Sequence, residues 1–114
     1  PLSKNNPYHP INIKTYNDIP KEKLPDTESL KDTYERVIKY YLDNISKNLD
    51  KNVLIAAHGN SIRALCKYLF NIDDNTISKL EIPTANPLLI TFENKKIKQA
   101  KYLDASRAKD LIKF

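Results

Sequence analysis

The clearest hydrophobic pattern in the chain lies between residues 26 and 49. Apolar side chains recur there at the spacing of one helix face: Leu30, Tyr34, Val37, Ile38, Tyr41, Leu42 and Ile45. This spacing predicts a long helix whose apolar stripe packs against a core. Asp26 or Thr27 is expected to cap its start, and Glu28 and Asp32 place negative charge near the positive end of the helix dipole.

Between residues 52 and 70 the apolar residues change from a continuous run to the spacing of a helix. Residues 52–57 are a short apolar run with β-branched members, which is typical of a strand buried on both faces of a parallel sheet. The next stretch, residues 61–70, predicts a helix with these residues on one side: Ile62, Leu65, Cys66, Leu69 and Phe70. Because Cys66 lies on this apolar side, we expect it to pack in the core rather than to react.

Shorter elements are predicted beyond residue 70. Asp73 is a candidate N-cap for a short third helix. Residues 87–93 and 96–103 have the composition of two strands joined through residues 94–95. The two strands are expected to form either a hairpin or neighbouring edge strands.

The chain is expected to form one domain over residues 1–114, in three parts. Residues 1–25 hold most of the prolines and lack an apolar period, so we expect an extended segment there. Residues 26–104 carry the helix–strand–helix–strand core, and residues 105–114 form a helical or mobile tail. This order is typical of an α/β layered fold with a mainly parallel sheet.

The predicted sheet is thin, because only one strand in this sequence is apolar enough to be fully buried. We therefore expect the chain to belong to a larger sheet that is covered on both faces. The sequence begins with proline and contains no methionine, which supports the expectation of a longer parent chain. Apolar faces left uncovered in this piece are expected to favour self-association.

Composition narrows the possible partners. The net charge is +5, but the basic residues are mostly lysines spread along the chain, and aromatic residues are not interleaved with arginine. We therefore expect no nucleic-acid partner. No apolar run is long enough to cross a bilayer, so no membrane partner is expected. The single cysteine excludes an internal disulfide and fits a reducing cytoplasm.

The junction between the apolar run and the next helix is the candidate site. His58 falls at the carboxyl end of the predicted strand, where open α/β sheets place their ligand crevices. Gly59 is the only glycine in the chain and lets a ligand or another backbone approach closely. Asn60 is expected to cap the helix, whose free first-turn N–H groups favour a phosphate or carboxylate. Arg63 and Lys67, one turn apart, are expected to add positive field.

A structural interpretation remains open on the residues alone. His58 would then bridge turn carbonyls, and Gly59 would be a steric requirement of the turn. A metal site lacks support, because no second His or Cys lies at ligand spacing from His58. A serine nucleophile lacks support too, because the sequence HGNSI does not match Gly-x-Ser-x-Gly and His9, among prolines, is better explained by structure.

Three stretches together resemble a known family. Residues 24–41 (LPDTESLKDTYERVIKYY), 53–69 (VLIAAHGNSIRALCKYL) and 80–93 (LEIPTANPLLITFE) are similar, in order and spacing, to the C-terminal half of the cofactor-dependent phosphoglycerate mutases. These enzymes belong to the histidine phosphatase superfamily. The resemblance covers nearly the whole chain, and the combination of TESLKDT with AAHGNSIRAL is specific to the mutases. The resemblance implies that this chain is the C-terminal portion of a three-layer fold with a mainly parallel sheet.

The resemblance also implies an activity. The family interconverts 2- and 3-phosphoglycerate through a phosphohistidine, with 2,3-bisphosphoglycerate as the priming donor and without a metal. His58 matches the second active-site histidine, which stabilises the transferring phosphoryl group, and Gly59 and Asn60 match a pair that binds substrate. The family's nucleophilic histidine and acid/base glutamate match no position here. We therefore expect this chain alone to be inactive, as a part of a cytoplasmic, homo-oligomeric enzyme.

One loop departs from the family pattern. The family reads Pro-Thr-Gly-x-Pro where this chain reads PTANP at residues 83–87. Because asparagine tolerates the left-handed backbone region, we hypothesise that the conformational freedom of the missing glycine has moved to Asn86.

Two other functions remain open. One is a broad phosphomonoesterase of the same superfamily, although TESLKDT and IPTANP favour a mutase. The other is a non-catalytic protein that retains only a phosphate-binding pocket or acts as a scaffold.

Overall fold

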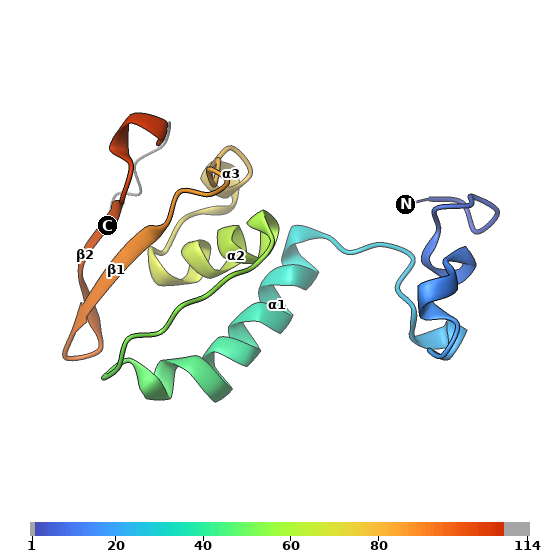
Figure 1. The fold of residues 1–114 in the computed structure, drawn as a ribbon, viewed down its shortest axis with the longest axis horizontal. Helices are drawn as coiled ribbons and strands as arrows, with labels where there is room; N and C mark the ends of the chain where they lie inside the picture. The colour runs from blue at the N-terminus through green and yellow to red at the C-terminus, as the bar shows by residue number, and fades with distance from the viewer. Residues whose placement is uncertain (1, 109–114) are drawn as a thin grey trace.

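The computed structural model describes residues 2–108 and contains two helices packed against each other. Helix α1 (Leu30–Tyr40) lies beside helix α2 (Gly59–Leu69), and the short helix α3 (Asp74–Ile77) follows α2 (Figure 1). Strands β1 (Leu88–Glu93) and β2 (Lys96–Tyr102) form an antiparallel hairpin. Among the helices described, none is both long and apolar enough to cross a membrane.

The first predicted helix is present, but it begins later than expected. Ser29 is the N-cap, rather than Asp26 or Thr27. Its Oγ accepts a hydrogen bond from the Asp32 N–H at 3.2 Å, and the Asp32 carboxylate accepts one from the Ser29 N–H at 2.8 Å. This reciprocal pair satisfies two N–H groups at the start of the helix. The Ser29 hydroxyl group also donates to the Asp32 carboxylate at 2.6 Å, and this bond, followed by the one from the Ser29 N–H, lowers the pKa of the Asp32 carboxyl group.

The chain stays helical beyond α1 as far as Asn48, and we call residues 30–48 the first helical path. Residues Tyr41–Ile45 form a π-helical turn, and Ser46–Asn48 form a 3-10 turn. The aromatic ring of Tyr41 meets the ring of Tyr68 on α2 edge to face, with centroids 5.9 Å apart. The apolar stripe predicted over residues 26–49 therefore packs in a core, as expected, and its partner is α2, although only the middle of the predicted helix is regular α-helix.

The core consists of two clusters of buried side chains. One joins α2 to α3 and the segment after it, through Cys66, Phe70, Ile77 and Leu80. The other joins α1 and the turn after it to α2, through Ile38, Tyr41 and Leu65. Asp73 caps α3, as predicted, because its Oδ1 accepts hydrogen bonds from the N–H groups of Asn75 and Thr76, both at 2.9 Å.

The burial of Cys66, which the sequence predicted, has a chemical consequence. Burial raises the pKa of its thiol to about 12. Only the thiolate reacts with alkylating reagents, so near pH 8 we expect Cys66 in the folded chain to react on the order of a thousandfold more slowly than a free thiol. Iodoacetamide labelling followed by mass spectrometry measures this rate. The unfolded chain in guanidinium chloride is the control, and equal rates in both states would contradict the burial.

Residues 52–57 depart most from the prediction. They form no strand ladder, and Val53, Leu54 and Ile55 expose 43%, 93% and 41% of their surfaces. A strand buried on both faces needs neighbours at its edges, and the two strands among residues 2–108 pair with each other. The described residues therefore do not form the expected mainly parallel sheet. Figure 1 shows this stretch running alone from the end of the first helical path to α2.

The hairpin is one of the two arrangements that the sequence left open. Leu88 pairs with Tyr102 and Glu93 with Lys96. The connecting residues Asn94 and Lys95 have φ angles of 50° and 63°, in the left-handed region that two-residue hairpin turns require.

The loop at residues 83–87 contradicts our hypothesis about Asn86. The residue in the left-handed region is Ala85, with φ of 54°. Asn86 is instead buried, and its carboxamide bonds the backbone of Asp104 in both directions, donating to the carbonyl at 2.8 Å and accepting from the N–H at 3.0 Å. These side-chain bonds hold Asn86 in place, and the unusual φ is found at the residue before it. Arg107 adds a bond from its Nη2 to the Thr84 carbonyl at 2.8 Å.

Replacing Ala85 by glycine tests this conformation. Alanine in the left-handed region costs about 1–2 kcal/mol, and the greater freedom of glycine in the unfolded chain offsets up to about 1 kcal/mol of the gain. We expect Ala85→Gly to raise the free energy of unfolding by up to about 1 kcal/mol, as measured by urea denaturation. The matched control is Ala105→Gly, at an exposed position outside the left-handed region, which should lower it. A loss of stability in Ala85→Gly as large as in the control would contradict the assignment.

The amino-terminal segment is not simply extended. It contains 3-10 turns at Pro10–Asn12, Lys14–Tyr16 and Lys21–Lys23. His9 is fully buried there, with its Nε2 3.3 Å from an Asp26 oxygen. Figure 1 shows this segment beyond the start of α1, away from α2 and the hairpin.

The predicted tail is only partly described. Residues Ala105–Arg107 form a 3-10 turn, whereas residues 109–114 lie outside the described part of the chain.

Candidate functional site

His58 is the N-cap of α2, which corrects the expectation that Asn60 would be. Helical geometry begins at Gly59, so His58 is the last residue with extended backbone angles. Its ring Nδ1 accepts a hydrogen bond from the Asn60 N–H at 3.4 Å. When the ring is neutral, this places the proton on Nε2. The exposed imidazole therefore offers an N–H donor to a ligand in front of the helix.

Gly59 is not required by the described structure. Its φ lies outside the left-handed region, and a Cβ placed on it would meet no atom within 4 Å. Neither the turn nor the local packing therefore explains the only glycine of the chain. The space beside it is open, which agrees with the interpretation that something outside the described residues approaches there.

Asn60 makes a contact that the sequence analysis missed. Its Oδ1 accepts a hydrogen bond from Nη1 of Arg63 at 2.8 Å. The Nε of Arg63 also donates to the Leu80 carbonyl at 2.8 Å. The signal was present in the sequence, because residues three apart on a helix are neighbours. With Oδ1 engaged, the two hydrogens on Nδ2 of Asn60 are available to a ligand.

Lys67 does not contribute to the site as expected. Its ammonium group donates to the Ile72 carbonyl at 2.7 Å and pairs with the Asp74 carboxylate at 2.9 Å. Both partners lie at or before the start of α3, so the charge of Lys67 is neutralised there. Of the two basic residues predicted to support the site, only Arg63 reaches it.

The first turn of α2 completes a set of donors. The N–H groups of Ser61 and Ile62 bond to the His58 carbonyl, at 2.9 and 3.1 Å. The Gly59 N–H has no hydrogen-bond partner among the described residues. It lies, with the positive end of the helix dipole, at the amino-terminal end of α2, which also holds His58 and Asn60. This turn contains no acidic residue.

The groups at this end of α2 are hydrogen-bond donors of the kind that an anionic ligand requires. His58, Gly59 and Asn60 offer three different donors, and no carboxylate in the turn opposes a negative ligand. Among residues 2–108, no group of three His, Cys, Asp or Glu side chains is placed to hold a metal ion.

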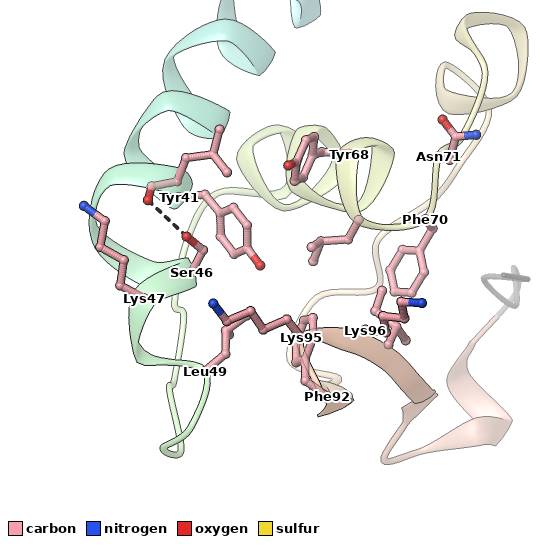
Figure 2. A pocket seen from close by; sticks show the side chains of 13 residues that line it. Tyr41, Ser46, Lys47, Leu49, Tyr68, Phe70, Asn71, Phe92, Lys95 and Lys96 are labelled. Atoms are coloured by element: carbon pink, nitrogen blue, oxygen red, sulfur yellow. Dashed lines mark hydrogen bonds between the residues drawn. The ribbon is translucent and has the colours of Figure 1, made fainter.

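A hollow in the described part of the chain lies elsewhere. It has a volume of about 770 Å³ and is bounded by the end of the first helical path, the end of α2 and the turn of the hairpin. Figure 2 shows Tyr41 and Tyr68 on one side and Phe92, Lys95 and Lys96 of the hairpin on the other. His58, Gly59 and Asn60 do not line it. A smaller hollow of about 310 Å³ borders the site through Arg63.

Sequence comparisons identify similar proteins. Residues 6–105 match the histidine phosphatase superfamily (branch 1). A protein of Pelagibacter ubique named 2,3-bisphosphoglycerate-dependent phosphoglycerate mutase is 63% identical over 117 aligned residues, which cover 100% of this chain and 49% of that protein. Proteins of the same name from Maricaulis maris and Hyphomonas neptunium are 46% and 53% identical, over 97% and 77% of this chain and 47% and 38% of their own lengths. The chain thus spans about half the length, or less, of these curated relatives.

Proposed function

Because the chain belongs to the histidine phosphatase superfamily, we propose that it is the phosphoryl-binding portion of a 2,3-bisphosphoglycerate-dependent phosphoglycerate mutase. The single observation that carries the proposal is the set of donors of His58, Gly59 and Asn60 at the amino-terminal end of α2, in a turn without an acidic residue. The proposed reaction interconverts 2- and 3-phosphoglycerate through a phosphohistidine, and 2,3-bisphosphoglycerate supplies the priming phosphoryl group.

Each donor has a role in this proposal. Phosphoryl transfer depends mostly on positioning and on stabilising negative charge on the equatorial oxygens of the phosphoryl group. The Nε2–H of His58 stabilises that charge as it develops. The Gly59 N–H and the Nδ2 hydrogens of Asn60 bind phosphate oxygens, and the open space at Gly59 gives the substrate room to approach. The donor set suits an anionic phosphate ester and requires no metal.

The remaining parts of the proposed enzyme lie outside this sequence. We infer that another part of the protein supplies the nucleophilic histidine and the acid/base glutamate. Residues 52–57 would then become a strand of a mainly parallel sheet in a three-layer fold, and the hollow shown in Figure 2 would be covered by that sheet. The proposed enzyme acts in the cytoplasm on small phosphoglycerates and forms a homo-oligomer.

A chimera tests the proposal directly. The chain replaces the matching residues of the Pelagibacter ubique relative, and turnover is followed by coupling 2-phosphoglycerate formation to enolase. We expect turnover that depends on added 2,3-bisphosphoglycerate, whereas the chain by itself should show none. The unmodified relative is the positive control.

Other outcomes point to the alternatives. Release of inorganic phosphate from phosphoglycerate without isomerisation would favour a phosphomonoesterase. A folded chimera that binds phosphoglycerate but turns nothing over would favour a non-catalytic phosphate-binding protein. Either result would overturn the proposed mutase activity.

A further inference from the structure

We propose that Arg63 is a positioning residue that orients the Asn60 carboxamide as a hydrogen-bond donor to a phosphoryl oxygen. The inference rests on the proposed function, because it assigns a role within the same site. Arg63 itself is not proposed to touch the substrate.

The argument begins with the symmetry of a carboxamide. The oxygen and the nitrogen of an asparagine side chain occupy nearly equivalent positions, yet one accepts hydrogen bonds and the other donates them. A phosphate oxygen only accepts, so Asn60 helps to bind phosphate in just one of its two orientations. In the described structure, Arg63 is the only side-chain partner of the Asn60 carboxamide.

Arg63 selects that orientation because a guanidinium group can only donate. Its Nη1 lies 2.8 Å from Asn60 Oδ1, and the opposite orientation would bring two donors together. The bond is charge-assisted and polarises the carboxamide, which strengthens the Nδ2 hydrogens as donors. A positive charge behind the amide also favours an anion in front of it.

Arg63 can do this because it is itself fixed. Its Nε donates to the Leu80 carbonyl at 2.8 Å, and Leu80 belongs to the buried core. The two bonds use different nitrogens of one rigid fork, so anchoring Nε also aims Nη1. A lysine at this position offers a single flexible ammonium group and could not hold both partners in the same geometry.

A double-mutant cycle in the chimera tests the inference. We expect Asn60→Ala and Arg63→Gln each to lower kcat/KM between about tenfold and a hundredfold, because the first removes the Nδ2 donor and the second leaves its orientation unfixed. If Arg63 acts through Asn60, adding Arg63→Gln to Asn60→Ala should change kcat/KM by less than about twofold. Arg63→Lys should recover part of the activity. Lys67→Gln, one turn further along α2, is the matched control and should stay within about twofold of the unmodified chimera.

The result that overturns the inference is independence. If the losses from Asn60→Ala and Arg63→Gln multiply in the double variant, Arg63 acts by another route. Arg63→Lys is taken through the same cycle, so the test stands even if Arg63→Gln fails to fold; melting temperatures are measured for every variant. Failure of the proposed function gives a different result, because the chimera without these substitutions would then show no turnover that depends on 2,3-bisphosphoglycerate. If the losses in kcat/KM multiply while His58→Ala still has a large effect, only the role of Arg63 is rejected and the proposed function stands.

Discussion

Replacing His58 by alanine in the chimera is expected to slow turnover on the order of a hundredfold or more. The change removes the Nε2–H donor from the place where negative charge develops on the transferring phosphoryl group. Loss of one such donor typically raises the barrier by about 2.7–4 kcal/mol. Steady-state kinetics with saturating 2,3-bisphosphoglycerate measure the effect. Because the lost interaction forms mainly in the transition state, kcat should fall more than KM rises.

Two further measurements separate catalysis from folding in this experiment. His58 also caps α2, and loss of an N-cap costs about 1 kcal/mol of stability, which a thermal melt detects. His58→Gln keeps a side-chain N–H donor and should recover part of the lost turnover. Unchanged turnover in His58→Ala would end the proposed role of His58.

The second large effect is expected in the core. Replacing Leu80 by alanine in the chain should lower the free energy of unfolding by about 2–5 kcal/mol, because it leaves a cavity in the cluster between α2 and α3. Leu54→Ala is the matched control: it is the same chemical change at a side chain that is 93% exposed, and it should stay within about 0.5 kcal/mol. Urea denaturation followed by circular dichroism measures both. Equal losses would contradict the described packing.

The same pair of variants also tests the proposed sheet. If residues 52–57 become a buried strand in the longer protein, Leu54→Ala should be costly in the chimera although it is nearly neutral in the chain alone. Leu80→Ala should lower the free energy of unfolding by a similar amount in the chimera and in the chain alone. A neutral Leu54→Ala in the chimera would reject the covering of this segment by a sheet.

Features decided by nearby residues were predictable from the sequence. The helical stripe that includes Tyr34 and Ile38, the Asp73 cap and the connection of two strands through residues 94–95 all depend on contacts within a few residues, although the sequence left open whether those strands form a hairpin. The spacing of apolar residues and the chemistry of single turn residues report such contacts directly. The burial of Cys66 followed from the same helical period.

Features decided by competition or by distant partners were not predictable. Ser29 caps α1 in place of Asp26 because Asp32 lies three residues further on and completes the reciprocal pair. Asn86 is held by Asp104, eighteen residues away, and the left-handed residue of this loop is Ala85. The apolar run at residues 52–57 has no strand partner within the described chain, so its periodicity alone could not establish a sheet.

The candidate site also has features that the sequence predicted and features that it did not. Its location at His58, Gly59 and Asn60 was predicted from the single glycine and the start of a helix, and their role in binding remains a prediction. The sequence did not predict which of these residues caps α2, because His58 rather than Asn60 is the N-cap. The bond between Arg63 and Asn60 required the structure, because the sequence gives the spacing of two side chains but not the direction in which each points.

The contact between Asn86 and Asp104 has a consequence for the hairpin. The Leu103 N–H bonds to the Pro87 carbonyl, and proline has no N–H to return the bond. The Asn86 carboxamide, bonded to the Asp104 backbone in both directions, takes the place of a peptide group one step beyond. The two strands are therefore locked at both ends, by the turn at residues 94–95 and by a side chain that imitates backbone. The register between β1 and β2 is therefore set at both ends, so a further strand that pairs with the hairpin meets backbone groups in one fixed order.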